Sequence, residues 1–178
     1  MINQLQRVRD GKEAEASLLI LDLEFIASSR RVLEIALGEV NSGKVLLDVR
    51  VDNECTTKEL LTKPDGRSIA DRSDRIRGLK SLTSVYGSVD PGKCSGKRTA
   101  SEIAEMIINA GVTKKSIILT WHTSTFDLDL LRELLELAGF DDILPPTENC
   151  IPAQKGLEDW KSFHHKARYA FSTFIRRP

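Results

Sequence analysis

The chain has 178 residues, of which 40% are hydrophobic and 29% are charged, values typical of a soluble globular protein. Its 26 lysines and arginines balance its 26 aspartates and glutamates, which excludes a global positive field, so binding to nucleic acid must come from local patches. No apolar run approaches the length of a membrane span, and the polar stretch 1–16 lacks the apolar core of a signal peptide. We therefore expect a cytoplasmic or nuclear protein that does not engage membranes, with a polar N-terminal extension (1–16) followed by one domain (17–178).

Three cysteines, Cys55, Cys94 and Cys150, are isolated in the sequence and odd in number. Their spacing matches neither a zinc site nor a disulfide framework, so we expect reduced, buried thiols. The cysteines therefore indicate no metal or redox site.

The first predicted elements are three strands in succession. The segment SLLILDLEFIA (17–27) begins with an apolar run typical of a buried strand, and the runs VLEIALGEV and VLLDVRV flank the turn sequence Asn-Ser-Gly. The second and third strands are therefore expected to form an antiparallel hairpin. Residues 52–98 are polar and rich in charges, and for them we expect mostly loop with short helical pieces.

The second half of the chain alternates between helix and strand. In the segment 99–111, Thr99 and Glu102 have the spacing of a capping box, and Gly111 is placed to end the helix. The remaining expected elements are a short buried strand at 116–121, a helix at 126–140, and a region at 156–174 that is helical toward its end. Strands followed by alternating helix and strand predict a single α/β domain built on a mixed sheet flanked by helices.

Two carboxylates, Asp22 and Glu24, stand near the end of the first predicted strand. Residues two apart on a strand share a face, so these side chains lie together while Leu23 faces away. Two neighbouring anions repel and are costly to bury unless divalent cations lie between them, and carboxylate oxygens suit magnesium or manganese. Such a pair is more often a solvated strand face, but the apolar residues on both sides of it here indicate burial.

Two further segments carry groups of the same chemistry. In WHTSTFDLDLL (121–131), Ser124 is a candidate helix cap, and Asp127 is either a carboxylate favoured by the dipole at a helix start or a third acidic group beside the pair. In FHHKARYAF (163–171), His165 is either a surface histidine of a basic helix or an imidazole close to the same acids.

Together, the three segments resemble the motifs of the DEDDh family of 3′–5′ exonucleases, which have a ribonuclease H-like fold. DLEF resembles the first motif, Asp-x-Glu on the first strand. HTSTFDLDLL resembles the second, with Thr123 where asparagine is usual, and HKARYA resembles the third, with Ala170 where an aspartate is usual. The resemblance covers the chain from about residue 17 to its end and implies a ribonuclease H-like mixed sheet flanked by helices.

The resemblance implies a metal-dependent exonuclease that releases nucleoside 5′-monophosphates from the 3′ end of single-stranded RNA or DNA, with RNA slightly preferred. It implies two Mg²⁺ or Mn²⁺ ions held by Asp22, Glu24 and Asp127, and His165 as the base that takes the proton from the attacking water. The positions that it implies for substrate binding are Leu23, Phe25, His122 and Phe126.

A methyl group at position 170 cannot bind a metal ion, and three explanations stay open. Ala170 is an engineered inactivating change, a natural loss, or a change offset by a carboxylate from another segment. We favour the first, because the other motif positions, including His165, are intact. The leading hypothesis is an exonuclease weakened or inactivated at this position, and the alternative is a catalytically dead domain that binds nucleic acid or protein.

Overall fold

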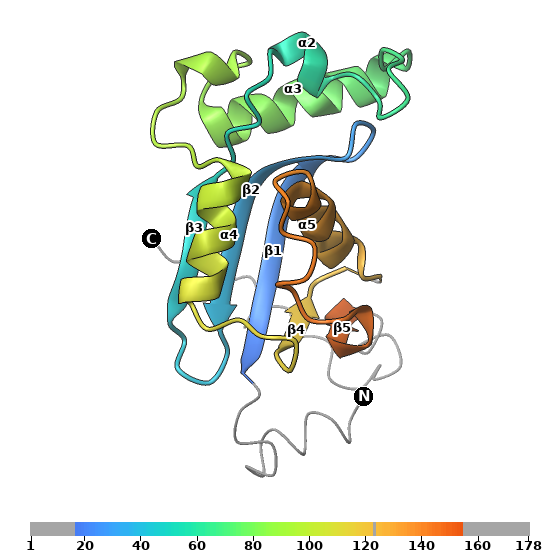
Figure 1. The fold of residues 1–178 in the computed structure, drawn as a ribbon. Helices are drawn as coiled ribbons and strands as arrows, with labels where there is room; N and C mark the ends of the chain where they lie inside the picture. Colours follow the sequence, from blue (N-terminus) through green and yellow to red (C-terminus); the bar gives the residue numbers. More distant parts are fainter. Residues whose placement is uncertain (1–16, 123, 155–178) are drawn as a thin grey trace.

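The structure, a computed structural model, describes residues 17–122 and 124–154, so the N-terminal extension lies outside the described residues. A five-stranded mixed sheet forms its centre, with the strand order β3-β2-β1-β4-β5 (Figure 1). Strand β2 is antiparallel to both of its neighbours, whereas β1, β4 and β5 are parallel. The strands are β1 (Leu18–Ile26), β2 (Arg31–Glu39), β3 (Val45–Arg50), β4 (Ile117–Thr120) and β5 (Cys150–Pro152). The predictions of a single α/β domain on a mixed sheet and of an antiparallel hairpin are confirmed.

Helices cover one face and one end of this sheet. In Figure 1, α4 and α5 lie against the same face of the sheet, while α2 and α3 lie across the end at which β1 stops and β2 begins. The helical elements of the described residues are α2 (Thr57–Leu60), α3 (Arg72–Tyr86), η1 (Pro91–Lys93), α4 (Ala100–Asn109), α5 (Phe126–Glu136) and η2 (Thr147–Asn149). None of the described helices has the length and apolar character needed to span a membrane.

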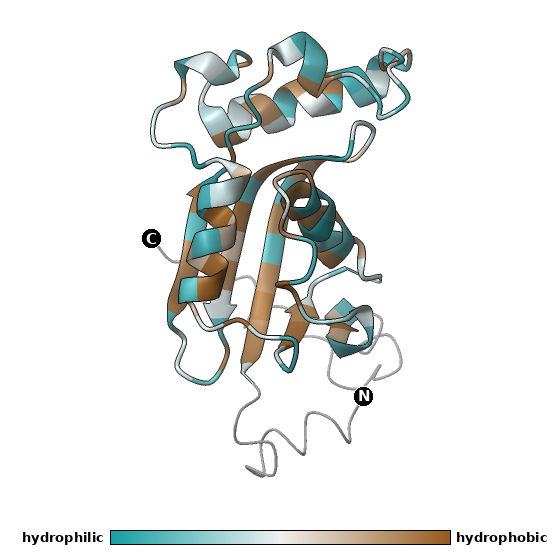
Figure 2. Ribbon diagram, in the orientation of Figure 1, coloured by the Kyte–Doolittle hydropathy of each residue, from teal (hydrophilic) through white to brown (hydrophobic). Residues whose placement is uncertain are grey.

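The main core lies between the sheet and the helices α4 and α5. Leu19, Leu21 and Leu23 alternate along β1 and point to this side, and none of them is more than 6% exposed. Their partners in the helices are Ile103, Ile107, Leu128, Leu131 and Leu135. Figure 2 shows apolar residues concentrated along the strands. Asp22 and Glu24 are consequently on the opposite face of β1.

A second, smaller core lies under α3 and contains Ile26 and Leu33 of the sheet. The prediction of mostly loop over 52–98 is wrong for α3, a helix of 15 residues that is capped by Asp71 and ends at Gly87, where φ is 70°. The helix covers only the end of the sheet, and so few of its positions need to be apolar that the helical period is weak in the sequence. Its buried residues are Gly78, Leu82, Val85 and Tyr86.

The other predicted elements differ from the structure in detail. The capping box of α4 is confirmed, since the Glu102 amide donates to Thr99 Oγ1 at 3.3 Å and the Thr99 amide donates to Glu102 Oε2 at 2.8 Å. Helix α5 begins after Thr125, not Ser124, and has no side-chain cap. Strand β5 was not predicted, because its three residues are too few to show a strand period. All three cysteines are free, as expected, but only Cys150 is buried.

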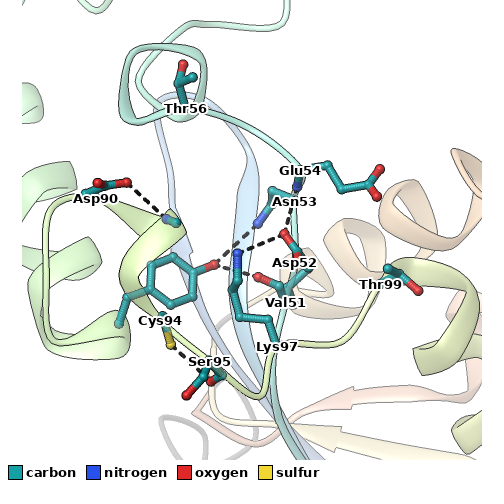
Figure 3. Close-up of polar contacts among 12 residues, drawn as sticks. Val51, Asp52, Asn53, Glu54, Thr56, Asp90, Cys94, Ser95, Lys97 and Thr99 are labelled. Carbon is teal, nitrogen blue, oxygen red and sulfur yellow. Dashed lines mark hydrogen bonds and ion pairs between the residues drawn. The ribbon is translucent and has the colours of Figure 1, made fainter.

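Polar contacts attach the α3 layer to the end of β3 (Figure 3). Lys97 Nζ lies 3.0 Å from Asp52 Oδ1, and the Tyr86 hydroxyl donates to the Val51 carbonyl at 2.8 Å. Asn53 Nδ2 donates to the carbonyl of Val32 at 2.8 Å. The bonds from Tyr86 and Asn53 satisfy main-chain carbonyls at the point where strand pairing stops, and the bond from Tyr86 attaches α3 to this end of the sheet.

Replacing Gly78 with valine is expected to lower the free energy of unfolding by about 1–3 kcal/mol. A Cβ at this position would lie 2.6 Å from Leu61 Cδ2 and 3.3 Å from Ile26 Cγ2, so the Leu61 side chain or α3 would have to shift. Urea denaturation measures the change, and Ser84→Val, on the exposed side of the same helix, controls for the low helix propensity of valine. Equal losses in the two variants would contradict the close approach at Gly78.

Candidate functional site

The acidic pair lies on the central strand of the sheet. Leu19, Ile20 and Leu21 are buried on both faces of β1, but the burial expected around the pair is incomplete, since Asp22 is half-buried and Glu24 is exposed. The residue opposite Glu24 on β2 is Glu34, and the residue opposite Asp22 is Ala36. The two side chains therefore share one face of the sheet, as predicted, at the end of β1 that leads toward α3.

Parallel pairing of β4 with β1 brings Asp127 to the same end of β1. Leu21 is paired with Thr120, the last residue of β4, so the chain leaves β4 next to the position of Asp22. It then passes through residues 121–125 and enters α5 at Phe126. Asp127 lies in the first turn of α5, where the helix dipole favours a carboxylate, and it is only 1% exposed.

The Asp127 carboxylate is in an electrostatically unfavourable position. The pKa of Asp127 is raised to about 6, chiefly by burial, while the charge of His122 lowers it and the negative charges of Asp22 and Glu24 raise it. Its Oδ1 has no hydrogen-bond partner within the described part of the chain, and His122 Nε2 lies 4.0 Å away. The three carboxylates thus influence one another through space, and a cation is the group that would offset their cost.

The acidic side chains of this site do not form a metal coordination shell in this structure. Among the residues that the structure describes, no three or more histidine, cysteine, aspartate or glutamate side chains are grouped so that they could hold a metal ion. The orphaned Oδ1 of Asp127 and the oxygen chemistry of its acidic neighbours nonetheless suit a hard divalent cation.

An aromatic wall, formed by Phe25, His122 and Phe126, lies next to Asp127, since His122 Nε2 is 4.0 Å from Asp127 Oδ1. The rings of Phe25 and Phe126 meet edge to face with centroids 5.3 Å apart, and the ring of His122 lies 6.1 Å from that of Phe25. Three of the four positions implied for substrate binding are therefore brought together. The fourth, Leu23, has its side chain in the main core.

Arg30 supports this wall and was not identified from the sequence. Its guanidinium lies 4.9 Å from the centroid of the Phe126 ring and makes two hydrogen bonds to Glu133, of 3.0 and 2.5 Å. Its backbone adopts φ = 56°, a conformation uncommon for a residue with a side chain. No motif marks Arg30, and the only signal in the sequence is its place in the short turn between two predicted strands.

Glu34 also belongs to this acidic face, although the sequence alone gave no reason to assign it a role. Its pKa is raised, first by burial and then by the negative charge of Asp48, while Arg50 Nε, 3.9 Å from Glu34 Oε1, acts in the opposite direction. The alternation of VLEIAL could have placed Glu34 opposite the acidic pair, had the register of the first two strands been known.

His165 and Ala170 lie outside the described residues, as does Thr123. Comparison with protein-family models and with curated proteins gives no match to this chain. The function must therefore be inferred from the site.

Proposed function

We propose that the chain has a ribonuclease H-like fold and forms a divalent-metal-dependent 3′–5′ exonuclease domain that Ala170 weakens or inactivates. The observation that carries this proposal is the Asp127 carboxylate, which is 1% exposed and has an Oδ1 without a hydrogen-bond partner in the described part of the chain. The charges of Asp22 and Glu24 reach the same group. A protein that binds no cation would gain from replacing such a carboxylate with an apolar residue.

The strand arrangement supports the proposed fold. The acidic pair lies on β1 in the middle of the sheet, the hairpin β2–β3 continues the sheet on one side, and β4 and β5 continue it on the other. Because β4 runs parallel to β1, the segment that follows it delivers a side chain to the end of β1 that carries the acids. The resemblance implies a convergence of acidic groups at this end of the first strand.

The described residues of the site are proposed to have different roles in binding metal and substrate. Asp22, Glu24 and Asp127 are proposed to hold the metal ions, which when bound lower the pKa of a water and stabilise charge at the scissile phosphate. The rings of Phe25 and Phe126 offer surfaces on which a terminal base can stack, a type of contact that tolerates any base. Because the Leu23 side chain is in the core, only its main chain is available to a substrate.

His165 is proposed as the base that takes a proton from the attacking water, and single-stranded RNA is proposed as the substrate in preference to DNA. The products are nucleoside 5′-monophosphates. Digestion of end-blocked oligonucleotides by the Ala170→Asp variant tests the direction of attack. A 5′-blocked strand is expected to be degraded and a 3′-blocked strand to resist, whereas equal cleavage of both would indicate an endonuclease.

A second candidate function is a catalytically dead domain that binds nucleic acid or protein. It is favoured by the alanine at position 170 and by the absence of an assembled metal-holding group among the described residues. Whether a carboxylate at position 170 restores hydrolysis distinguishes the two functions.

A further inference from the structure

Charge is distributed unevenly along this electrically balanced chain. The segment 56–98, which contains α2, α3 and η1, has ten lysines and arginines but only five aspartates and glutamates, although the net charge of the whole chain is zero. The α3 layer is therefore strongly basic, while the neighbouring face of β1–β3 carries the acidic groups described above. Local patches of this kind attract polyanions even when the net charge does not.

The acidic side chains of the segment are all engaged locally. Three of them serve helix starts and two form ion pairs with arginines of the same segment. These are Glu59 in the capping box of α2, Asp71 at the start of α3, Asp90 at the start of η1, Asp65 with Arg67, and Asp74 with Arg77.

Three basic side chains of α3 have no acidic partner among the residues that the structure describes. The side chains of Arg72, Arg75 and Lys80 are exposed and make no hydrogen bond or ion pair with any residue that the structure describes. Arg72 and Lys80 are eight residues apart and lie on one side of the helix. At a rise of 1.5 Å per residue, their α-carbons are about 12 Å apart along the helix axis. Between them lies Ile76, which is 42% exposed.

A groove runs along this side of α3, with a volume of about 440 Å³ and a lining of Ile76, Leu79, Lys80, Thr83 and Ser84. One exposed isoleucine is too small an apolar anchor for an amphipathic helix of a partner protein, which engages a groove through three or four apolar side chains. Hydroxyl groups and unpaired cations are instead the groups that contact a phosphate backbone.

The position of α3 relates this surface to the candidate site. Ile26, which contacts α3 near Gly78, lies two residues beyond Glu24, or about 7 Å along β1. The basic helix α3 therefore packs against β1 directly beyond the acidic pair. A strand that placed its 3′ end beside Glu24 would have its preceding phosphates within reach of this end of the sheet.

We infer that the exposed side of α3, through Arg72 and Lys80, binds backbone phosphates of the single-stranded nucleic acid that enters the candidate site. The direction of the strand rests on the proposed function, but the binding does not. Its contacts are to phosphates, so the surface does not distinguish one base sequence from another.

The test measures binding of a 5′-labelled single-stranded oligonucleotide to the full chain by fluorescence anisotropy, in EDTA so that no hydrolysis occurs. The variant Arg72→Gln/Lys80→Gln is compared with Lys44→Gln/Lys114→Gln, which removes the same charge. Both control positions are exposed and lie at the opposite end of the sheet, Lys44 directly before β3 and Lys114 three residues before β4.

The α3 variant is expected to bind at least about 10-fold more weakly at 100 mM salt, and its slope of log K against log salt is expected to fall by about 1.4, as for two lost phosphate contacts. The control variant should change the affinity less than about 2-fold. Equal losses in both variants, no binding by the unmodified chain, or equally effective displacement by polyglutamate would each overturn the inference.

The outcome is separable from that of the proposed function. Weaker binding by the α3 variant, together with no hydrolysis by Ala170→Asp, would support this surface and refute the exonuclease. Hydrolysis by Ala170→Asp, with an affinity that the α3 variant leaves unchanged, would refute this surface and support the exonuclease.

Discussion

Replacing Ala170 with aspartate is expected to raise the rate of Mg²⁺-dependent release of 5′-monophosphates by at least about 100-fold, because even residues that only support metal ligands contribute 10–100-fold. The substitution adds the carboxylate that the third motif lacks to the acids at positions 22, 24 and 127, which are proposed to hold the metal ions. Gel analysis of a 5′-labelled RNA, with the matching DNA in parallel, measures the rate.

Two further variants show whether this gain comes from a restored ligand. Ala170→Asn has nearly the shape of the aspartate but no charge, and it should remain close to background. Ala170→Asp combined with Asp127→Asn should return to background, because it again lacks one carboxylate. If Ala170→Asp releases no product from either RNA or DNA, the exonuclease proposal fails and the binding domain is favoured.

Asp127→Asn is expected to stabilise the metal-free protein at pH 7.5, by about 1–3 kcal/mol. The pKa of Asp127 is about 6 in the folded protein and near its ordinary value of 3.8 when unfolded, so the folded state binds the proton more tightly. Stability from this group is therefore full below about pH 4 and is lost as the pH rises through 6. An amide at this position stays neutral, and it removes that loss while retaining some cost of an unsatisfied polar group.

Urea denaturation between pH 4 and 8, in EDTA, measures this difference. The advantage of Asp127→Asn should be largest above pH 7 and should disappear near pH 4. Asp129→Asn, in the same helix, removes a half-exposed carboxylate that pairs with Arg132 at 3.3 Å, and it should give no gain. A gain for Asp127→Asn that is independent of pH would contradict the burial of a charged carboxylate.

Much of the fold could be predicted because local signals and tertiary structure agree. The alternation of Leu19, Leu21 and Leu23 marks β1, and the capping box of Thr99 and Glu102 marks the start of α4. Helix α3 was not predicted because it buries few side chains, and β5 was not predicted because it has only three residues. Both elements depend on the rest of the sheet being present, and sequence periodicity does not report such dependence.

Three acidic residues of the candidate site could be identified from the sequence, but their arrangement could not. The spacing of Asp22 and Glu24 placed them on one face, whereas their approach to Asp127 depends on the parallel pairing of β1 with β4. No local pattern specifies that pairing, and only the resemblance to an exonuclease family implied it. Arg30 shows the same limit, because its contact with Phe126 joins a turn to a helix almost one hundred residues away.

The central claim is that Asp22, Glu24 and Asp127 share a divalent cation, and thermal unfolding with Mn²⁺ alone tests it most directly. For a weak site with a dissociation constant near 1 mM, 10 mM Mn²⁺ is expected to stabilise the unmodified chain by about 1.4 kcal/mol, or about 2–4 °C in Tm. The Tm of Asp127→Asn should not respond. An unmodified chain whose Tm is unchanged by Mn²⁺, or an equal rise in the variant, would contradict the shared cation.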